Sequence, residues 1–348
     1  MPSRRTAAPW RAVAARSALV AVAAVIAGSC GSSTNAETAA SPTSVVSATV
    51  APTPPVASPT LTPPDPSPSP TPDLRPAAPN GQRVPEVPED AADLADALVE
   101  SERVIRNPAA SPDDVADAGR LQQRIYRRWA VDTTIDPIVF DRVPDDLRPV
   151  IELQLAARRE FVAMPTGLPT AEEVPAWEIV APEAADQLLA HYLEAETASG
   201  IEWEFLAAIN LVETGMGRIR GLSTAGAQGP MQFIPDTWDW IGEGDVNDPR
   251  DAILAAGRLL AVGGGPEDMA SALFAYNQSD HYVRAVTTYA DIMRAEPRAF
   301  YGLYHWEIYF FTTSGDVWLP VGYRTEAPIP VDDYLAAAPW SNTAAIGG

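Results

Sequence analysis

Residues 201–213 read IEWEFLAAINLVE, and this stretch decides the fold class. Its apolar side chains Ile201, Phe205 and Ile209 recur every four residues, which predicts one buried face of an α-helix. Glu213 ends the pattern four residues after Ile209, so it lies on or beside that apolar face. Desolvation and the negative end of the helix dipole both disfavour its anion and raise its pKa, as a general acid requires. Helix geometry alone leaves open a solvated glutamate at a fraying helix end.

Similar periodic patterns lie on both sides of this stretch and predict a mainly α-helical fold. They cover residues 89–106, the segment after Ser111, and residues 145–161, 188–198, 249–262, 269–276 and 282–293. The acidic residues of 86–165 are expected on solvated helix faces, and no catalytic constellation is found there. Aromatic-rich residues 305–311 and the run 317–321 flank a turn, which predicts a β-hairpin or extended flap.

The N-terminal thirty residues have the pattern of an export signal. Four arginines and no acid precede the apolar run Ala18–Gly28, which is too short to span a bilayer. Small residues then lead to Cys30, the only cysteine, and resemble a bacterial lipobox, although Ala27 stands where a branched residue is usual. We therefore expect lipidation at Cys30; a secretory signal cut nearby, leaving a free thiol, is the alternative.

Proline is concentrated between Pro42 and Pro88, and few large apolar residues accompany it. Such a segment cannot offset its ordering entropy by burial, so we expect a disordered tether. The chain has 46 acidic residues against 24 basic ones, all arginine, and a net charge of −22. Phosphate binding requires a basic face, so this balance argues against nucleic acid as a partner and against polybasic docking to anionic lipid.

The segment after Glu213 is rich in glycine and small residues, which let a backbone approach a ligand closely. Residues 223–235 read STAGAQGPMQFIP, and Ala275-Tyr276-Asn277 ends a later predicted helix. The amides of Gln232 and Asn277 suit sugar hydroxyl and acetamido groups. His191, His281 and His305 are isolated and lack metal-ligand spacing, so no metal or cofactor is expected.

Three ordered motifs resemble the soluble lytic transglycosylase family of the lysozyme-like superfamily. They are Glu213-Thr214, Gly226–Pro235 and Ala275–Asn277, with Thr214 and Pro230 in place of the usual Ser and Leu. The resemblance covers residues 170–312, and Trp203, Trp238, Trp306 and Leu319–Tyr323 look like its actinobacterial branch.

The resemblance implies non-hydrolytic cleavage of the β-1,4 bond between N-acetylmuramic acid and N-acetylglucosamine, with a 1,6-anhydromuramyl product, in cell-wall remodelling. Glu213 would be the catalytic acid and base. The implied substrate-binding residues are Thr214, Ser223, Gly229, Met231, Gln232, Tyr276 and Asn277. Thr214 and Ser223 would position Glu213 or cap local turns, and Met231 would line the groove floor or lie in the core. Trp306 and Trp318 would stack on sugar or pack in the core.

The expected organisation has five parts. They are a signal peptide (1–29), a disordered linker (30–86), a helical region (87–168), a lytic transglycosylase domain (169–312) and a C-terminal extension (313–348). The expected location is the outer face of the cell membrane through a lipid anchor, or else the secreted or cell-wall fraction. The alternative functions are a lysozyme-like peptidoglycan hydrolase and a non-catalytic glycan-binding lipoprotein. Asp236, Glu202 and Glu204 remain open as an assisting second acid.

Overall fold

The computed structural model describes residues 75–164 and 171–343. The signal peptide, Cys30 and nearly all of the proline-rich tether therefore lie outside the described residues. Within the described ranges, no helix is both long enough and apolar enough to cross a membrane.

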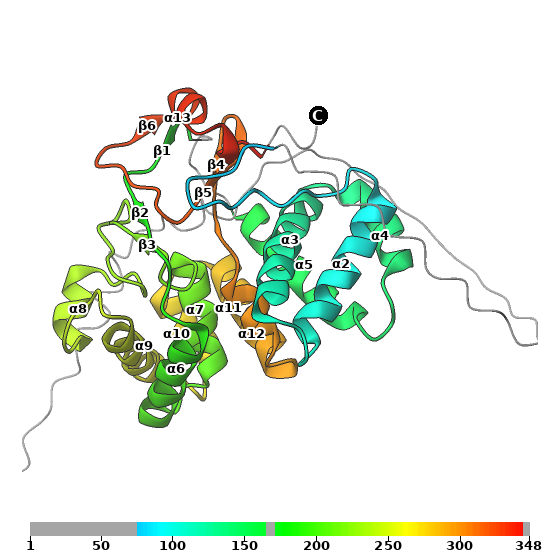
Figure 1. The fold of residues 1–348 in the computed structure, drawn as a ribbon. Coiled ribbons are helices and arrows are strands. Elements are labelled where there is room, and N and C mark those ends of the chain that lie inside the picture. The colour runs from blue at the N-terminus through cyan, green and yellow to red at the C-terminus, as the bar shows by residue number, and fades with distance from the viewer. Residues whose placement is uncertain (1–74, 165–170, 344–348) are drawn as a thin grey trace, which may run out of the picture. The chain divides into compact units, whose positions relative to one another are not determined.

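The described chain is mainly helical, as the periodicity predicts (Figure 1). A first group of helices comprises α2 (Ala91–Arg106), α3 (Pro112–Val131), η3 (Thr133–Ile135), α4 (Asp136–Arg142) and α5 (Arg148–Ala163). A second group comprises α6 (Ala185–Ser199), α7 (Trp203–Thr214), α8 (Pro235–Ile241), α9 (Pro249–Gly263), α10 (Met269–Tyr276), α11 (Asp280–Ala295) and α12 (Ala299–Tyr304). Helices α4, α8 and α12 were not predicted, because each is too short to show a period clearly.

Short strands and a C-terminal segment complete the described fold. The antiparallel pairs are β1 (Glu173–Val174) with β6 (Ile329–Pro330), β2 (Glu178–Ile179) with β3 (Ile219–Arg220), and β4 (Ile308–Thr312) with β5 (Gly315–Leu319). Helix α13 (Val331–Ala337) and η4 (Pro339–Ser341) follow β6. The β4–β5 pair is the predicted hairpin, with Thr312 opposite Gly315 at its turn.

Helix α7 is the centre of the second group of helices. All of its residues from Glu204 to Thr214 are buried, which is typical of a helix surrounded by others. Helices α6, α9, α11 and α12 pack around it. Gly215 ends the helix in the left-handed conformation, with φ of 60°. The carboxyl end of α7 therefore lies inside the protein rather than at a frayed surface.

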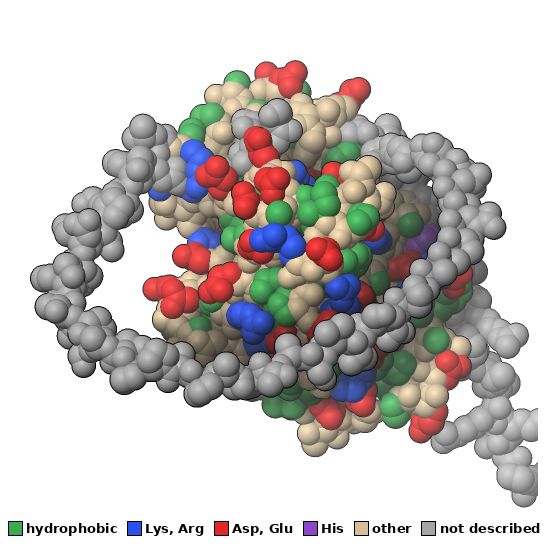
Figure 2. Space-filling model, turned by 90° about the vertical axis from the view of Figure 1, so that its right-hand side faces the viewer, with side chains coloured by type: hydrophobic (Ala, Val, Ile, Leu, Met, Phe, Trp, Pro, Cys, Tyr) green, Lys and Arg blue, Asp and Glu red, His purple; other side chains and the backbone are tan. Residues whose placement is uncertain are grey.

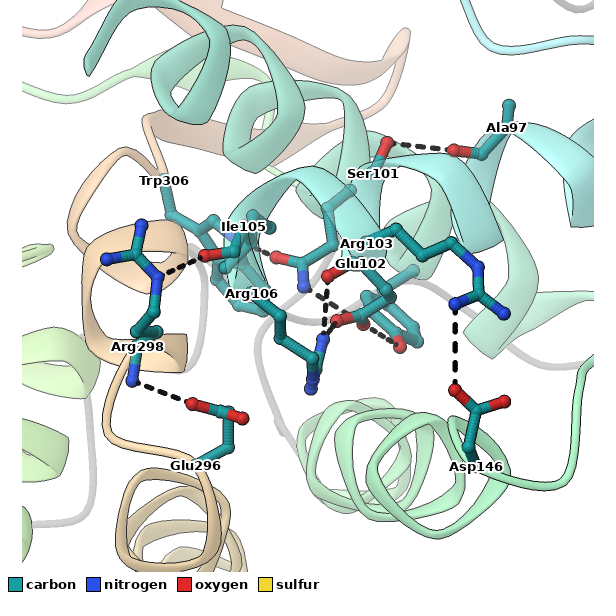
Figure 3. Close-up of polar contacts among 12 residues, drawn as sticks. Ala97, Ser101, Glu102, Arg103, Ile105, Arg106, Asp146, Glu296, Arg298 and Trp306 are labelled. Carbon is teal, nitrogen blue, oxygen red and sulfur yellow. Dashed lines mark hydrogen bonds and ion pairs between the residues drawn. The ribbon is translucent and has the colours of Figure 1, made fainter. Parts of the chain in front are cut away.

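A buried polar network joins the first group of helices to α12 (Figure 3). Glu102 on α2 is 1% exposed and accepts hydrogen bonds from Gln122 Nε2 at 3.0 Å and Tyr126 Oη at 2.8 Å. Gln122 in turn accepts from Trp306 Nε1 at 3.0 Å, just beyond α12. Glu102 is thus an exception to the expectation that the acidic residues of this region are solvated.

Packing begins earlier in the chain than the expected end of the linker at residue 86. Ala78 and Val84 are each 4% exposed and pack with Tyr309 and Trp318 of the β4–β5 hairpin. The large apolar area of these two aromatic rings stabilises a short extended segment that carries no periodic pattern of its own. On the face drawn in Figure 2, acidic and arginine side chains are interspersed.

Candidate active site

Glu213 lies one residue before the end of α7 and is 6% exposed. Burial raises its pKa from 4.5 to about 7, and a hydrogen bond from Tyr282 partly opposes this shift. The solvated helix-end glutamate that sequence left open is therefore not what the structure contains. A carboxyl group with this pKa is partly protonated at neutral pH, so it can both donate and accept a proton there.

Two tyrosines face Glu213 from neighbouring helices. Tyr282 on α11 is 2% exposed, and its hydroxyl donates to Glu213 Oε1 at 2.9 Å. Tyr276, the last residue of α10, donates its hydroxyl to the Met231 carbonyl at 2.6 Å, and burial and Glu213 raise its pKa. Both phenols remain protonated near neutral pH, because burial raises the pKa of Tyr282 as well.

Tyr282 is not among the site residues predicted from the sequence, although one feature of its helix indicates it. It shares an apolar helix face with Val286 and Tyr289, at spacings of four and seven residues. A tyrosine on a buried face needs a hydrogen-bond partner for its hydroxyl. Its partner could not be named from sequence, because Glu213 is 69 residues away along the chain.

The glycine-rich segment forms a tight loop beside the end of α7. Gln228 and Phe233 exchange backbone hydrogen bonds at 3.0 and 2.9 Å, which closes the loop between them. Gly229 has φ of 75°, and a side-chain carbon there would overlap the Val246 carbonyl oxygen. Gln232 also has a positive φ, 52°, which is uncommon for a residue with a side chain and marks local strain.

The loop is fastened to α7 through the carbonyl oxygen of Pro230. Thr214 Oγ1 donates to this oxygen at 2.6 Å, and Asn210 Nδ2 donates to it at 2.8 Å. Thr214 Oγ1 also accepts from the Gly217 amide at 3.0 Å. The hydroxyl of Ser223 accepts from the amides of Ala225 and Ala227. Thr214 and Ser223 therefore cap and connect local turns, and among the described residues Glu213 receives its hydrogen bond from Tyr282 instead.

The remaining sequence-predicted residues differ in their surroundings. Met231 and Trp318 are fully buried among apolar side chains, and Trp306 is 6% exposed. The Gln232 amide donates to the Gly229 carbonyl at 2.9 Å, within its own loop. Asn277 is half-buried at the C-cap of α10, next to Tyr276. The structure thus brings Glu213, Tyr276 and the loop of Gly229 together, with Asn277 one residue beyond.

None of the three suggested second acids is placed as a close partner of Glu213. Glu202 forms an ion pair with Arg294, and Asp236 is exposed in the first turn of α8. Glu204 lies nine residues earlier on α7, roughly 13 Å along the helix axis at 1.5 Å per residue. Among the described residues, Tyr282 is the polar side chain that acts on the pKa of Glu213. The described residues also contain no cluster of three or more His, Cys, Asp or Glu that could hold a metal ion.

Comparison with known proteins agrees with this geometry. Residues 191–295, which carry Glu213, Tyr276 and Tyr282, match the model of the Transglycosylase SLT domain family. The chain contains an SLT transglycosylase domain. The matched residues run from α6 to the end of α11, so the SLT domain holds the whole cluster around Glu213.

The SLT domain is also similar to a curated relative. The chain is 31% identical over 126 residues to "Membrane-bound lytic murein transglycosylase F" of Thiobacillus denitrificans (strain ATCC 25259 / T1). This alignment covers 34% of the chain and 27% of the relative, so the chain spans about a quarter of the relative's length. No solved structure matches the chain.

Proposed function

We propose that this protein is a peptidoglycan lytic transglycosylase and that Glu213 is its catalytic residue. The observation that carries the proposal is the buried Glu213 carboxyl group, whose pKa is about 7 and which accepts a hydrogen bond from Tyr282 inside an SLT domain. The printed name of the similar relative, a lytic murein transglycosylase, supports the same substrate class. A hydrolase of the usual two-carboxylate type requires a second acid within about 5–9.5 Å. Glu204, roughly 13 Å from Glu213 along α7 at 1.5 Å per residue, lies outside that range.

The reaction needs one group that gives and then takes a proton. Protonated Glu213 donates its proton to the glycosidic oxygen as the bond from the muramyl C1 to that oxygen breaks. The carboxylate so formed takes the proton of the muramyl C6 hydroxyl, and O6 bonds to C1 to close the 1,6-anhydro ring. Glu213 ends protonated, no water is consumed, and a pKa near 7 suits both steps.

Residues around Glu213 are proposed to bind the sugar. Asn277, at the end of α10, and Gln232, in the strained loop, offer amides for hydroxyl and acetamido groups. Tyr276 fixes the loop by its bond to the Met231 carbonyl, and Gly229 keeps the loop close to Val246. Thr214 and Ser223 act indirectly, by holding the turns that shape the site. Met231 shapes the site through its carbonyl, which accepts the Tyr276 hydroxyl, and through the packing of its side chain in the core.

The cellular setting follows from the sequence features outside the described residues. We propose an exported protein lipidated at Cys30, with the proline-rich segment as a tether and residues 87–168 as a helical region before the SLT domain. The relative's name, membrane-bound, supports a place at the membrane. The expected export signal and the proposed peptidoglycan substrate favour its outer face, and we propose cell-wall remodelling there.

The test is digestion of purified peptidoglycan, followed by mass spectrometry of the released muropeptides. We expect 1,6-anhydromuramyl ends from the wild type and a loss of at least about a thousandfold in release by Glu213→Gln. Reducing-end products would identify a hydrolase instead. Unchanged release by Glu213→Gln would exclude Glu213 as the acid, and no release by the wild type would favour a glycan-binding protein.

A further inference from the structure

The first turn of α11 is held from outside the SLT domain by Glu160. Glu160 lies near the end of α5, which packs along α11. Its Oε1 accepts from Arg284 Nε, and its Oε2 accepts from Arg284 Nη2, both at 2.8 Å. His281 Nδ1 lies 2.8 Å from the same Oε2. The Glu160 carboxylate thus contacts two side chains within the first one and a half turns of α11.

The two residues that Glu160 contacts flank Tyr282 in the sequence. His281 directly precedes it, and Arg284 follows two residues later. Tyr282 carries the hydroxyl that donates to Glu213, and its amide donates to Ser279 Oγ at 3.3 Å. The turn of α11 that carries this hydroxyl is therefore held by the helix cap at Ser279 and by the contacts of Glu160.

A second contact holds the same two helices further along. Phe161, the residue after Glu160, stacks with Tyr289 on α11, with ring centroids 6.4 Å apart. Tyr289 is two helical turns beyond Tyr282 on the same buried face. Helix α5 therefore fixes both the axial position and the rotation of α11. A small rotation of α11 would carry the Tyr282 hydroxyl away from Glu213 Oε1, because hydrogen bonds weaken steeply with distance and angle.

We propose that Glu160 is a positioning residue for the reaction at Glu213 and acts through Tyr282. This inference rests on the proposed function, and it gives the helical region before the SLT domain a part in catalysis. Among the described residues, Tyr282 on α11 is the ionisable side chain that acts on the pKa of Glu213, and Glu213 in turn raises the pKa of Tyr276 on α10. Loss of the Tyr282 hydrogen bond removes the effect that lowers the pKa of Glu213, so that pKa rises.

The chain offers a matched control for the loss of a carboxylate. Glu194 on α6 forms the same two-bonded pair with Arg250 on α9, and its Oε2 accepts from Arg250 Nε at 2.8 Å. Both pairs are partly exposed, so each contributes little to global stability. Among the described residues, Glu194 forms its hydrogen bonds and ion pair with Arg250 and none with α11. Glu194→Ala therefore reproduces the loss of a surface ion pair without touching Tyr282.

The experiment compares three single variants, Glu160→Ala, Glu194→Ala and Tyr282→Phe. It also includes the double variant that combines Glu160→Ala with Tyr282→Phe. We expect Glu160→Ala to lower kcat about tenfold with little change in KM, and to move the titration midpoint of Glu213 up by about half a pH unit. The midpoint is read by carbon NMR of the glutamate carboxyl groups, with the signal assigned by Glu213→Gln. Glu160→Gln, which keeps an acceptor oxygen, should recover part of the rate.

The double variant decides whether Glu160 acts through Tyr282. In the Tyr282→Phe background, Glu160→Ala should change neither kcat nor the Glu213 midpoint further. Additive effects, or an equal effect of Glu194→Ala, would overturn the proposal. If the wild type releases no muropeptides, the proposed function fails, while the NMR titration still decides the role of Glu160.

Discussion

Glu213 combines its proposed proton-transfer role with a cost in stability. Its pKa is about 7 in the folded protein against 4.5 for the free side chain, so the folded state binds more protons between these values. The contribution of Glu213 to the free energy of unfolding is fully present below pH 4.5, and it is lost as the pH rises through 7. The loss amounts to about 3 kcal/mol, from 1.36 kcal/mol per pKa unit.

Glu213→Gln should therefore stabilise the protein at pH 8 and leave it almost unchanged at pH 4.5. The amide stays neutral, keeps an oxygen for the Tyr282 hydroxyl, and removes the pH dependence due to this residue. Thermal unfolding of both proteins from pH 4.5 to 8.5 measures the difference. Parallel curves across this range would mean that the Glu213 pKa is not raised in the folded state.

The activity of the wild type should fall on the alkaline side with a midpoint near 7. In the proposed reaction only the protonated form of Glu213 donates to the glycosidic oxygen, and the pKa of Glu213 in the folded protein is about 7. The measurement is kcat/KM for a soluble glycan fragment between pH 5 and 9, which reports the free enzyme. Activity that rises through this range would assign proton donation to another group.

At the scale of elements, sequence predicted the long helices and the hairpin but not the site's closest contact. Helix α7 and the region of α9 to α11 carried clear periodicity and caps, and their bounds differ from the structure by a few residues. Helices α8 and α12 and the two-residue strands depend on tertiary contacts, so local pattern does not show them. Glu213 was singled out by its position on an apolar face and by the motifs that follow it, which can both be read from the sequence, whereas its hydrogen bond to Tyr282 cannot.

The loop after α7 depends on Gly229 for its close approach to Val246. We expect Gly229→Ala to lower the free energy of unfolding by more than about 2 kcal/mol, from backbone strain and overlap with the Val246 carbonyl. Gly226→Ala is the control, because Gly226 has a similar φ of 78° but open space around it. It should cost about 1 kcal/mol. Urea unfolding of both variants measures the difference, and equal losses would show that the approach to Val246 contributes nothing.

At the scale of the whole molecule, the SLT domain is not separated from the helices that precede it. Residues 76–343 fall in one compact unit. The joining contacts, which include the packing of α5 on α11, lie between residues far apart in the chain, so local sequence patterns do not show them. Gln123 and Glu307 exchange two hydrogen bonds of 2.8 Å, and Arg298 Nε donates to the Ile105 carbonyl at 3.1 Å.

A fragment of residues 169–343 should therefore not fold to the native state, whereas residues 76–343 should. Removing α2 to α5 would expose the face of α11 that packs on α5 and that includes Tyr289. It would also remove Gln122, which accepts the hydrogen bond of Trp306 Nε1. Apolar burial of this kind contributes about 25 cal/mol per Å², and a large apolar face left in water favours aggregation. Both fragments can be compared by near-ultraviolet circular dichroism and by muropeptide release, with the intact mature chain as reference. A 169–343 fragment with native dichroism and full activity would show that the first helices are dispensable, and would then also remove the ground for a role of Glu160.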